Sequence, residues 1–324
     1  MRVSYLDVAK CLAIYLVCLG HVHPIYSSAA HHFIYSFHMP LFMLISGYFS
    51  SKSLAKPAKE FFTGKITNLV WPTIIFALLS ILVSFVIYGF NRSFVFSELF
   101  GCGWFLKCLF LCYVVAWVFL RLIKRWHLAL FLSALLVFVV PKGQLFNLNF
   151  LYLFFVTGYC CNKLRLLDIM SAYRLGAISV FFIIVFALNG AVRHYQVIDV
   201  DILKNNWSLL PIQYFVGMAG SLLIISIAKI IDSKKCIISD FSKQIGKYTL
   251  GVYLVQIIVI ERLIWRGMND FFSMLPVWQI DYIINPCVGL ISMLVCYYLV
   301  RLVIKNKIAS RVLFGNNYYK TERK

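Results

Sequence analysis

Long apolar runs restrict the fold of this chain more than any other feature of its sequence. Three of them approach the roughly twenty residues that cross about 30 Å of hydrocarbon as a helix, and they occupy residues 69–90, 211–231 and 282–304. Of the 324 residues, 62% are hydrophobic and 13% are charged, whereas an ordinary soluble domain is about half apolar and about a quarter charged. The sequence therefore predicts an all-α integral membrane protein that has the lipid bilayer as a partner.

Seven further apolar segments, several of them short or interrupted by polar residues, raise the expected number of spans. With them we predict a polytopic bundle of about ten transmembrane helices. The segment 127–141 is the weakest, because its apolar stretch is short enough for a re-entrant segment. The seven segments are residues 5–23, 33–50, 103–120, 127–141, 147–162, 174–191 and 247–264.

The positions of lysine and arginine test this count, because cytoplasmic loops retain positive charge. With ten spans, 23 of the 31 lysines and arginines fall on one side of the membrane and six fall on the other. We therefore expect both termini in the cytoplasm, a membrane-embedded domain over residues 1–304 and a basic cytoplasmic tail over residues 305–324. The net charge of +19 is then a topology signal, and we expect no nucleic-acid partner.

The ten cysteines raise the question of metal or disulfide chemistry. Most of them lie in apolar segments, where they are expected to be small buried side chains. No pair has the CxxC spacing of a zinc site, so we expect no metal. The connections between spans are too short for a soluble catalytic domain, and any chemistry must take place within the helical bundle.

Charged and polar residues interrupt the first predicted helix in a regular way. Lys10 and His21 are eleven residues apart, and eleven steps of about 100° return to within about 20° of the same direction, so both lie on one helix face. Their separation along the axis is about 16 Å, which suits the two ends of one groove. Asp7 lies three residues before Lys10 and can pair with it. An equally simple interpretation makes Asp7 and Lys10 a snorkelling pair near the cytoplasmic interface.

A second histidine, His38, lies in the next apolar segment and is followed by Pro40. Proline is tolerated in the first turn of a helix, so we predict a helix over residues 39–49 with His38 just before its N-terminus. The preceding residues would then be bent or re-entrant, and His38 would face a polar cavity that His21 shares. The alternative is a pair of interfacial histidines at the outer ends of two helices.

These two stretches resemble the acyltransferase 3 family of integral membrane acyltransferases. LDVAK followed by LVCLGH reproduces the family's first-helix pattern of a basic residue, ten residues and a histidine, here Lys10 and His21. FHMPLFMLISGYF, which includes His38, Ser46 and Tyr48, is similar to its second helix. The resemblance extends from about residue 4 to residue 304.

Two later stretches add to the resemblance and also depart from it. GWFL, with Trp104 and Phe105, is similar to the start of the family's fourth helix, and LGVYLVQ at 250–256 resembles its late Tyr-Leu motif. Many members have a histidine where this chain has Gln256. Many also carry two basic residues before the third-helix proline, and here only Lys65 remains.

The resemblance implies transfer of an acyl group, usually acetyl from acetyl-CoA, to a hydroxyl of a surface or lipid-linked carbohydrate in a bacterial inner membrane. It implies acyl-CoA as a donor substrate and no permanently bound cofactor. His21 would act as the base or as a transient acyl carrier, and His38 would orient His21 or the acceptor. The pantetheine arm would pass the end of the bundle marked by Asp7 and Lys10.

The remaining candidates have weaker roles. Ser46 and Tyr48 would support the two histidines, Trp104 and Phe105 would wall the acceptor cavity, and Lys65 and Gln256 would belong to the donor site. More often such aromatic residues form an interfacial belt, and such lysines are plain positive-inside residues. Two rival functions stay open: a transporter of lipid-linked sugar or polysaccharide, and a non-enzymatic subunit of an export complex.

Overall fold

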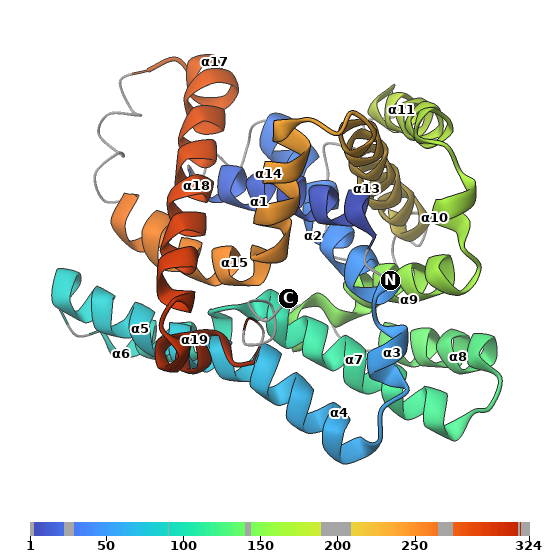
Figure 1. Ribbon diagram of the computed structural model, residues 1–324, viewed down its shortest axis with the longest axis horizontal. Coiled ribbons are helices and arrows are strands. Elements are labelled where there is room, and N and C mark those ends of the chain that lie inside the picture. Colours follow the sequence, from blue (N-terminus) through green and yellow to red (C-terminus); the bar gives the residue numbers. More distant parts are fainter. Residues whose placement is uncertain are drawn as a thin grey trace. The chain divides into compact units, whose positions relative to one another are not determined.

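The computed structural model describes residues 3–22, 29–89, 91–139, 144–188, 209–264, 275–316 and 318. Every regular element in these ranges is a helix (Figure 1), which confirms the all-α class. The chain forms two compact units. The first contains Met1–Ala13, Ala29–Phe61 and Cys108–Gly246, and the second contains Ile14–Ser28, Phe62–Lys107 and Lys247–Lys324.

The first unit is built mainly from α2, α9, α11 and α13, which pack in the order α9, α2, α13, α11. Helix α1 (Ser4–Val22) begins in this unit and ends in the second. The other helices with most of their residues here are α2 (Ala29–Tyr48), α3 (Ser51–Leu54), α7 (Trp104–Leu122), α8 (Trp126–Phe138), α9 (Leu148–Lys163), α10 (Leu166–Ile169), α11 (Ala172–Leu188), α13 (Leu209–Ser233) and α14 (Ile237–Lys247).

Two glycines let α2 and α9 approach closely. A Cβ atom at Gly47 would overlap the carbonyl oxygen of Phe155, and a Cβ atom at Gly158 would overlap the carbonyl oxygen of Leu44. Close packing at small residues is the usual way in which membrane helices associate, because burial of apolar surface gives no net gain within lipid. The last turns of α2 therefore lie in close backbone contact with α9.

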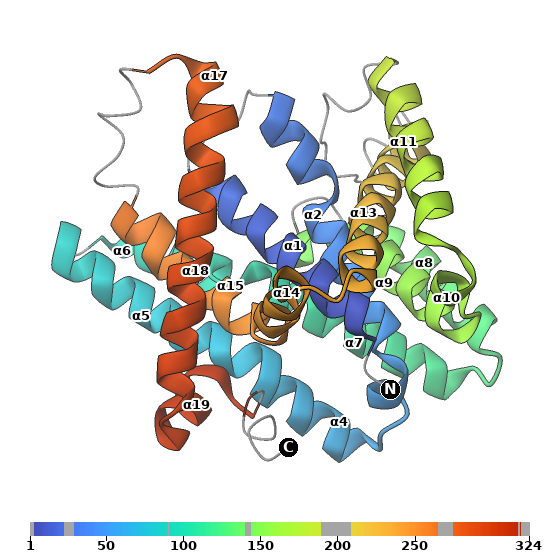
Figure 2. The ribbon, with the colours of Figure 1, turned by 45° about the horizontal axis from the view of Figure 1, so that its top comes forward.

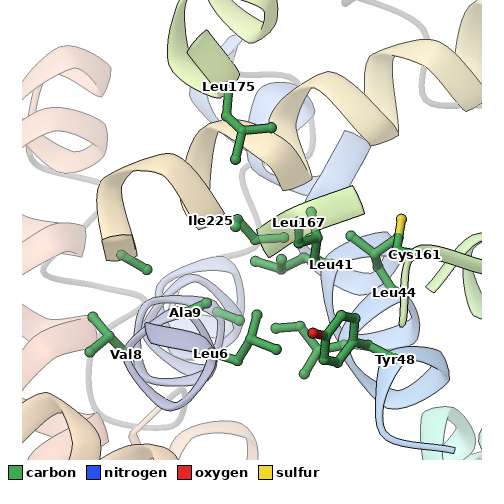
Figure 3. Packing of buried hydrophobic residues seen from close by; sticks show 13 residues of the cluster. Leu6, Val8, Ala9, Leu41, Leu44, Tyr48, Cys161, Leu167, Leu175 and Ile225 are labelled. Carbon is green, nitrogen blue, oxygen red and sulfur yellow. The ribbon is translucent and has the colours of Figure 1, made fainter. Parts of the chain in front are cut away.

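A cluster of buried apolar side chains joins α1 to this packing. Figure 3 shows Leu41, Leu44 and Tyr48 of α2 near Leu6 of α1 and Leu167 of α10. All five side chains are at most 3% exposed. The cluster holds the first turns of α1 in place within the first unit.

The second unit is organised around α5, α15 and α18. Helix α15 packs against both α5 and α18, and α19 contacts the same two helices (Figure 2). Its elements are α4 (Ala58–Lys65), whose first residues belong to the first unit, η1 (Ile66–Val70), α5 (Trp71–Tyr88), α6 (Arg92–Gly101), α15 (Thr249–Ile258), η4 (Val259–Ile264), α17 (Val277–Gln279), η5 (Ile280–Ile284), α18 (Asn285–Ile304) and α19 (Lys307–Phe314).

Five of the described helices are long and apolar enough to cross a membrane. The long apolar runs 211–231 and 282–304 lie within two of them, and most of the run 69–90 lies within a third, so those helix predictions are confirmed. The full number of spans, the side on which the termini lie and the domain boundary at residue 304 stay predictions. The five helices are Ser4–Val22, Ala58–Ile87, Trp104–Leu122, Pro211–Ser233 and Ile280–Ile304.

Part of the expected basic tail is ordered structure within the second unit. Asn306 caps α19 by accepting hydrogen bonds from the amides of Ile308 and Ala309, and the Trp71 indole donates to the carbonyl of Val312 at 2.9 Å. Beyond α19, the hydroxyl of Tyr318 accepts a hydrogen bond of 2.8 Å from an amide in the first turn of α15. This residue therefore supplies one of the N-terminal caps that a helix needs.

Candidate functional site

The second unit brings a histidine and a carboxylate together at the end of α1. His21 lies in the last turn of α1, and Glu261 lies in the π-helical turn η4, which continues α15. Nδ1 of His21 is 3.1 Å from Oε1 of Glu261, and the two side chains are 27% and 20% exposed. We call this contact the His21–Glu261 pair.

The contact selects one tautomer of the neutral imidazole. A carboxylate accepts and does not donate, so Nδ1 of His21 carries the proton and donates it to Glu261. The lone pair then lies on Nε2. A general base in an enzyme is often held in this way, with one ring nitrogen bound by a carboxylate and the other free to accept a proton from a substrate. Partial exposure of both side chains suits a group that must meet a substrate.

The residue next to Glu261 is held by a second set of contacts. The guanidinium of Arg262 donates to Oε2 of Glu98 at 2.7 Å and to the hydroxyl of Ser80 at 2.9 Å. It also lies over the Phe94 ring, 4.9 Å from the centroid. Glu98 is 7% exposed and Ser80 is fully buried. These contacts join η4 to α5 and α6.

Helix α6 is in turn held at its C-terminal end. The ammonium of Lys107, in the first turn of α7, donates to the carbonyls of Leu99 and Phe100 at 2.8 and 2.9 Å. A cation at the C-terminus of a helix satisfies its last carbonyls and interacts favourably with its dipole. Lys107 therefore has a structural partner that the sequence alone did not indicate.

A cysteine, Cys102, lies within electrostatic reach of these charged groups. Burial raises the pKa of the Cys102 thiol to about 12, and the Glu98 and Glu261 carboxylates add to this effect, while Lys107 and Arg262 oppose it. The thiolate is the nucleophilic form of cysteine. Burial therefore favours the neutral thiol of Cys102, which is the less nucleophilic form.

The aromatic candidates and Gln256 also lie in this unit. The rings of Trp104 and Phe105 are 6.2 Å apart and nearly perpendicular, and Phe105 meets Tyr253 of α15 at 5.9 Å. Gln256, one turn further along α15, is 1% exposed, and no described residue donates a hydrogen bond to its Oε1. Lys65, at the end of α4, is half-buried in the same unit. Their roles in acceptor and donor binding stay predictions.

The prediction that His38 lies at a break before a helix is wrong. Helix α2 runs without interruption from Ala29 to Tyr48, so His38 and Pro40 are both in its interior. Nδ1 of His38 is 2.8 Å from the carbonyl of Ile34, to which it donates, and the Ser36 hydroxyl donates to the carbonyl of Phe33 at 2.7 Å. Both side chains therefore bond to carbonyls of their own helix, and α2 continues through Pro40.

The other first-unit candidates lie close to the start of α1 or along α2. Lys10 contacts Asp7 at 3.0 Å, as expected from their spacing, and its ammonium is 5.0 Å from the centroid of the Phe49 ring. Tyr48 is buried in the apolar cluster, and the carbonyl of Ser46 accepts a hydrogen bond of 3.4 Å from a tyrosine of α7. His38, Ser46, Tyr48, Asp7 and Lys10 therefore belong to the first unit, and His21 belongs to the second.

Sequence reasoning missed Glu261, Glu98 and Arg262. Glu261 carried a usable signal, because it is a carboxylate within the apolar segment 247–264, and ionisable residues in such segments are rare and functional. Arg262 is one of the six basic residues that the ten-span topology places on the outer side of the membrane. No group of three or more His, Cys, Asp or Glu side chains in the described ranges is arranged to hold a metal ion.

One comparison with known proteins finds a match. The family model of an acyltransferase domain, that of the acyltransferase 3 family, matches residues 3–302, nearly the whole chain and both compact units. No curated protein and no solved structure shows a significant similarity to the sequence.

Proposed function

Because this chain belongs to the acyltransferase 3 family, we propose that it transfers an acetyl group from acetyl-CoA to a carbohydrate hydroxyl, with the His21–Glu261 pair as the catalytic base. The observation that carries this proposal is the 3.1 Å contact between Nδ1 of His21 and Oε1 of Glu261. A hydroxyl is a poor nucleophile until its proton is removed, and a positioned base typically contributes about 10²- to 10⁴-fold to the rate.

In the proposed reaction, Nε2 of His21 accepts the proton of the acceptor hydroxyl as its oxygen attacks the thioester carbonyl. The carbon–sulfur bond breaks, and CoA leaves as a thiolate that takes up the proton from the imidazolium. Glu261 stabilises the positive charge that develops on His21 between these steps. In a two-step variant, Nε2 first attacks the thioester carbonyl and CoA leaves as a thiolate. The acceptor hydroxyl then attacks the acetyl-imidazolium, its proton passes to the thiolate, and neutral His21 is released.

We further propose that the donor is supplied from the cytoplasm and that the enzyme belongs to a bacterial inner membrane. The acceptor would be a surface or lipid-linked sugar, and the aromatic faces of Trp104 and Phe105 suit a sugar ring. The lysines of α3 and α4, including Lys65, would meet the phosphates of CoA as point charges. The pantetheine arm would pass the end of α1 that carries Lys10.

The first experiment measures release of free CoA from acetyl-CoA by the purified protein in lipid vesicles, with and without a crude surface-glycan acceptor. It compares the wild type with His21→Ala and with His127→Ala as a matched control, because His127 is an exposed histidine at the start of α8. We expect acceptor-stimulated release that is lost in folded His21→Ala and kept in His127→Ala. Equal, negligible release in all three proteins with several acceptors would instead support a transporter.

A second measurement tests the acceptor side. Radiolabelled acetyl groups should appear on the glycan as an alkali-labile ester, in proportion to the CoA released. CoA release without labelled glycan would refute a carbohydrate acceptor while leaving an acyltransferase in place.

A further inference from the structure

Glu261 and Arg262 are neighbours in the chain but are held by different parts of the second unit. Successive residues of a helical turn point in different directions, and η4 sends Glu261 towards the end of α1 and Arg262 towards α5 and α6. Single π-helical turns are frequent at functional sites. The contacts of Arg262 therefore bear on the direction in which Glu261 points.

The Arg262 contacts form a stiff attachment. The side chains of Arg262 and Glu98 are only 16% and 9% exposed, and a charged hydrogen bond of 2.7 Å is among the stronger interactions in a protein. The bond to Ser80 fixes a second edge of the guanidinium, and the Phe94 ring covers its face. Lys107 holds the end of the helix that carries Glu98.

The His21–Glu261 pair is sensitive to small rotations of η4. A carboxylate about 6 Å from the helix axis moves by about 2 Å when the turn rotates by about 20°. Directed along the contact, a movement of that size lengthens the 3.1 Å distance to about 5 Å, beyond hydrogen-bond reach. The four other side chains of η4 are apolar and cannot form hydrogen bonds; they are Val259, Ile260, Leu263 and Ile264.

We propose that Arg262, anchored by Glu98 and Ser80, is a positioning residue that fixes the rotation of η4 and so keeps the carboxylate of Glu261 on Nδ1 of His21. Arg262 acts through Glu261 and does not itself touch the reacting atoms. This inference rests on the proposed function for its kinetic consequences, whereas its effect on His21 is measurable without any acyl transfer.

The kinetic test is a double-mutant cycle with Arg262→Met and Glu261→Gln. If Arg262 acts through Glu261, Arg262→Met lowers kcat at least about tenfold and leaves both KM values within about threefold. In a protein that already carries Glu261→Gln, Arg262→Met should lower kcat no further. Arg262→Lys keeps the positive charge but lacks the planar guanidinium that binds Glu98 and Ser80 together, so it should recover part of kcat. Losses that multiply in the double variant would overturn the proposal.

The second test follows His21 directly by mass spectrometry of its carbethoxylation by diethyl pyrocarbonate at about pH 8, where a free imidazole is neutral. A carboxylate on Nδ1–H makes Nε2 more nucleophilic, so Glu261→Gln, Arg262→Met and Glu98→Gln should slow the reaction of His21 by a similar factor. Arg301→Met serves as the control, because Arg301 of α18 binds the Tyr297 hydroxyl at 3.1 Å in the same unit.

The two readouts separate the two hypotheses. If the wild type transfers no acyl group and Arg262→Met still slows modification of His21, the proposed function fails and the positioning role stands. If acyl transfer occurs but Arg262→Met and Glu98→Gln leave kcat and His21 reactivity at the wild-type values, the positioning role is refuted. Should Arg262→Met fail to fold, Arg262→Lys and Glu98→Gln give the same comparison.

Discussion

Replacing Glu261 by glutamine isolates the charge of the carboxylate that contacts His21, because the amide keeps the size and an oxygen that accepts a hydrogen bond. In the proposed reaction His21 becomes an imidazolium as the acceptor hydroxyl attacks the thioester, and we take this attack as the rate-limiting step. At the observed 3.1 Å, an imidazolium and a carboxylate attract each other by about 5 kcal/mol if the effective dielectric constant is about 20.

Solvent reduces that value, since the two side chains are 27% and 20% exposed. Taking about half of it leaves about 2 to 3 kcal/mol of transition-state stabilisation. Because each 1.4 kcal/mol corresponds to about a tenfold change in rate, Glu261→Gln should lower kcat by about 30- to 150-fold. The KM for acetyl-CoA should change little, because the charge on His21 is absent from the ground state.

The assay is steady-state CoA release with purified protein in vesicles, with the fold checked by thermal melting. Glu60→Gln is the matched control, since Glu60 is an exposed carboxylate that faces Lys56 at 3.7 Å. A kcat for Glu261→Gln within threefold of the wild type would refute the idea that Glu261 stabilises a charge on His21. A parallel loss in Glu60→Gln would show that the effect is not specific to the pair.

Three further predictions concern packing and reactivity. Gly158→Leu should abolish or strongly destabilise the fold, because the leucine side chain would meet the backbone of α2 at Leu44. A melting temperature within about 2 °C of the wild type would contradict the close helix contact. Cys102, with its raised pKa of about 12, should resist iodoacetamide from neutral pH to about pH 9. Cys236, just before α14, is only partly buried and should be alkylated. Labelling of both at equal rates in the folded protein would show that Cys102 is not buried. Tyr318→Phe should lower the free energy of unfolding by about 1 to 2 kcal/mol, because it removes the acceptor of a buried amide, and a midpoint equal to the wild type in graded denaturing detergent would count against that bond.

Local features of the sequence predicted local features of the structure well. The long apolar runs became long helices, because an unbroken run of this length has no other way to satisfy its backbone in lipid. Asp7 and Lys10 pair because a spacing of three places them on one face of a helix. The first-helix and second-helix motifs were sufficient to identify the family.

Predictions that depended on tertiary structure were less successful. His38 was expected beside a helix start because Pro40 lacks an amide, but the ring and the Ser36 hydroxyl bind carbonyls of their own helix, and α2 continues. The partner of His21 lies in a segment far along the chain, and spacing rules reach only a few residues. A search for carboxylates in apolar segments would have found Glu261 but not its partner.

The hydrogen bond of Tyr318 also bears on how the site is assembled during synthesis. His21 is among the first residues to leave the ribosome, Glu261 follows much later, and the tyrosine that caps the first turn of α15 is made after both. Until then an amide at the start of the helix that leads into Glu261 lacks its partner. A nascent chain halted after α18 would carry every catalytic candidate and still lack this bond, so a premature stop there should yield a protein that is inserted but poorly active and readily degraded.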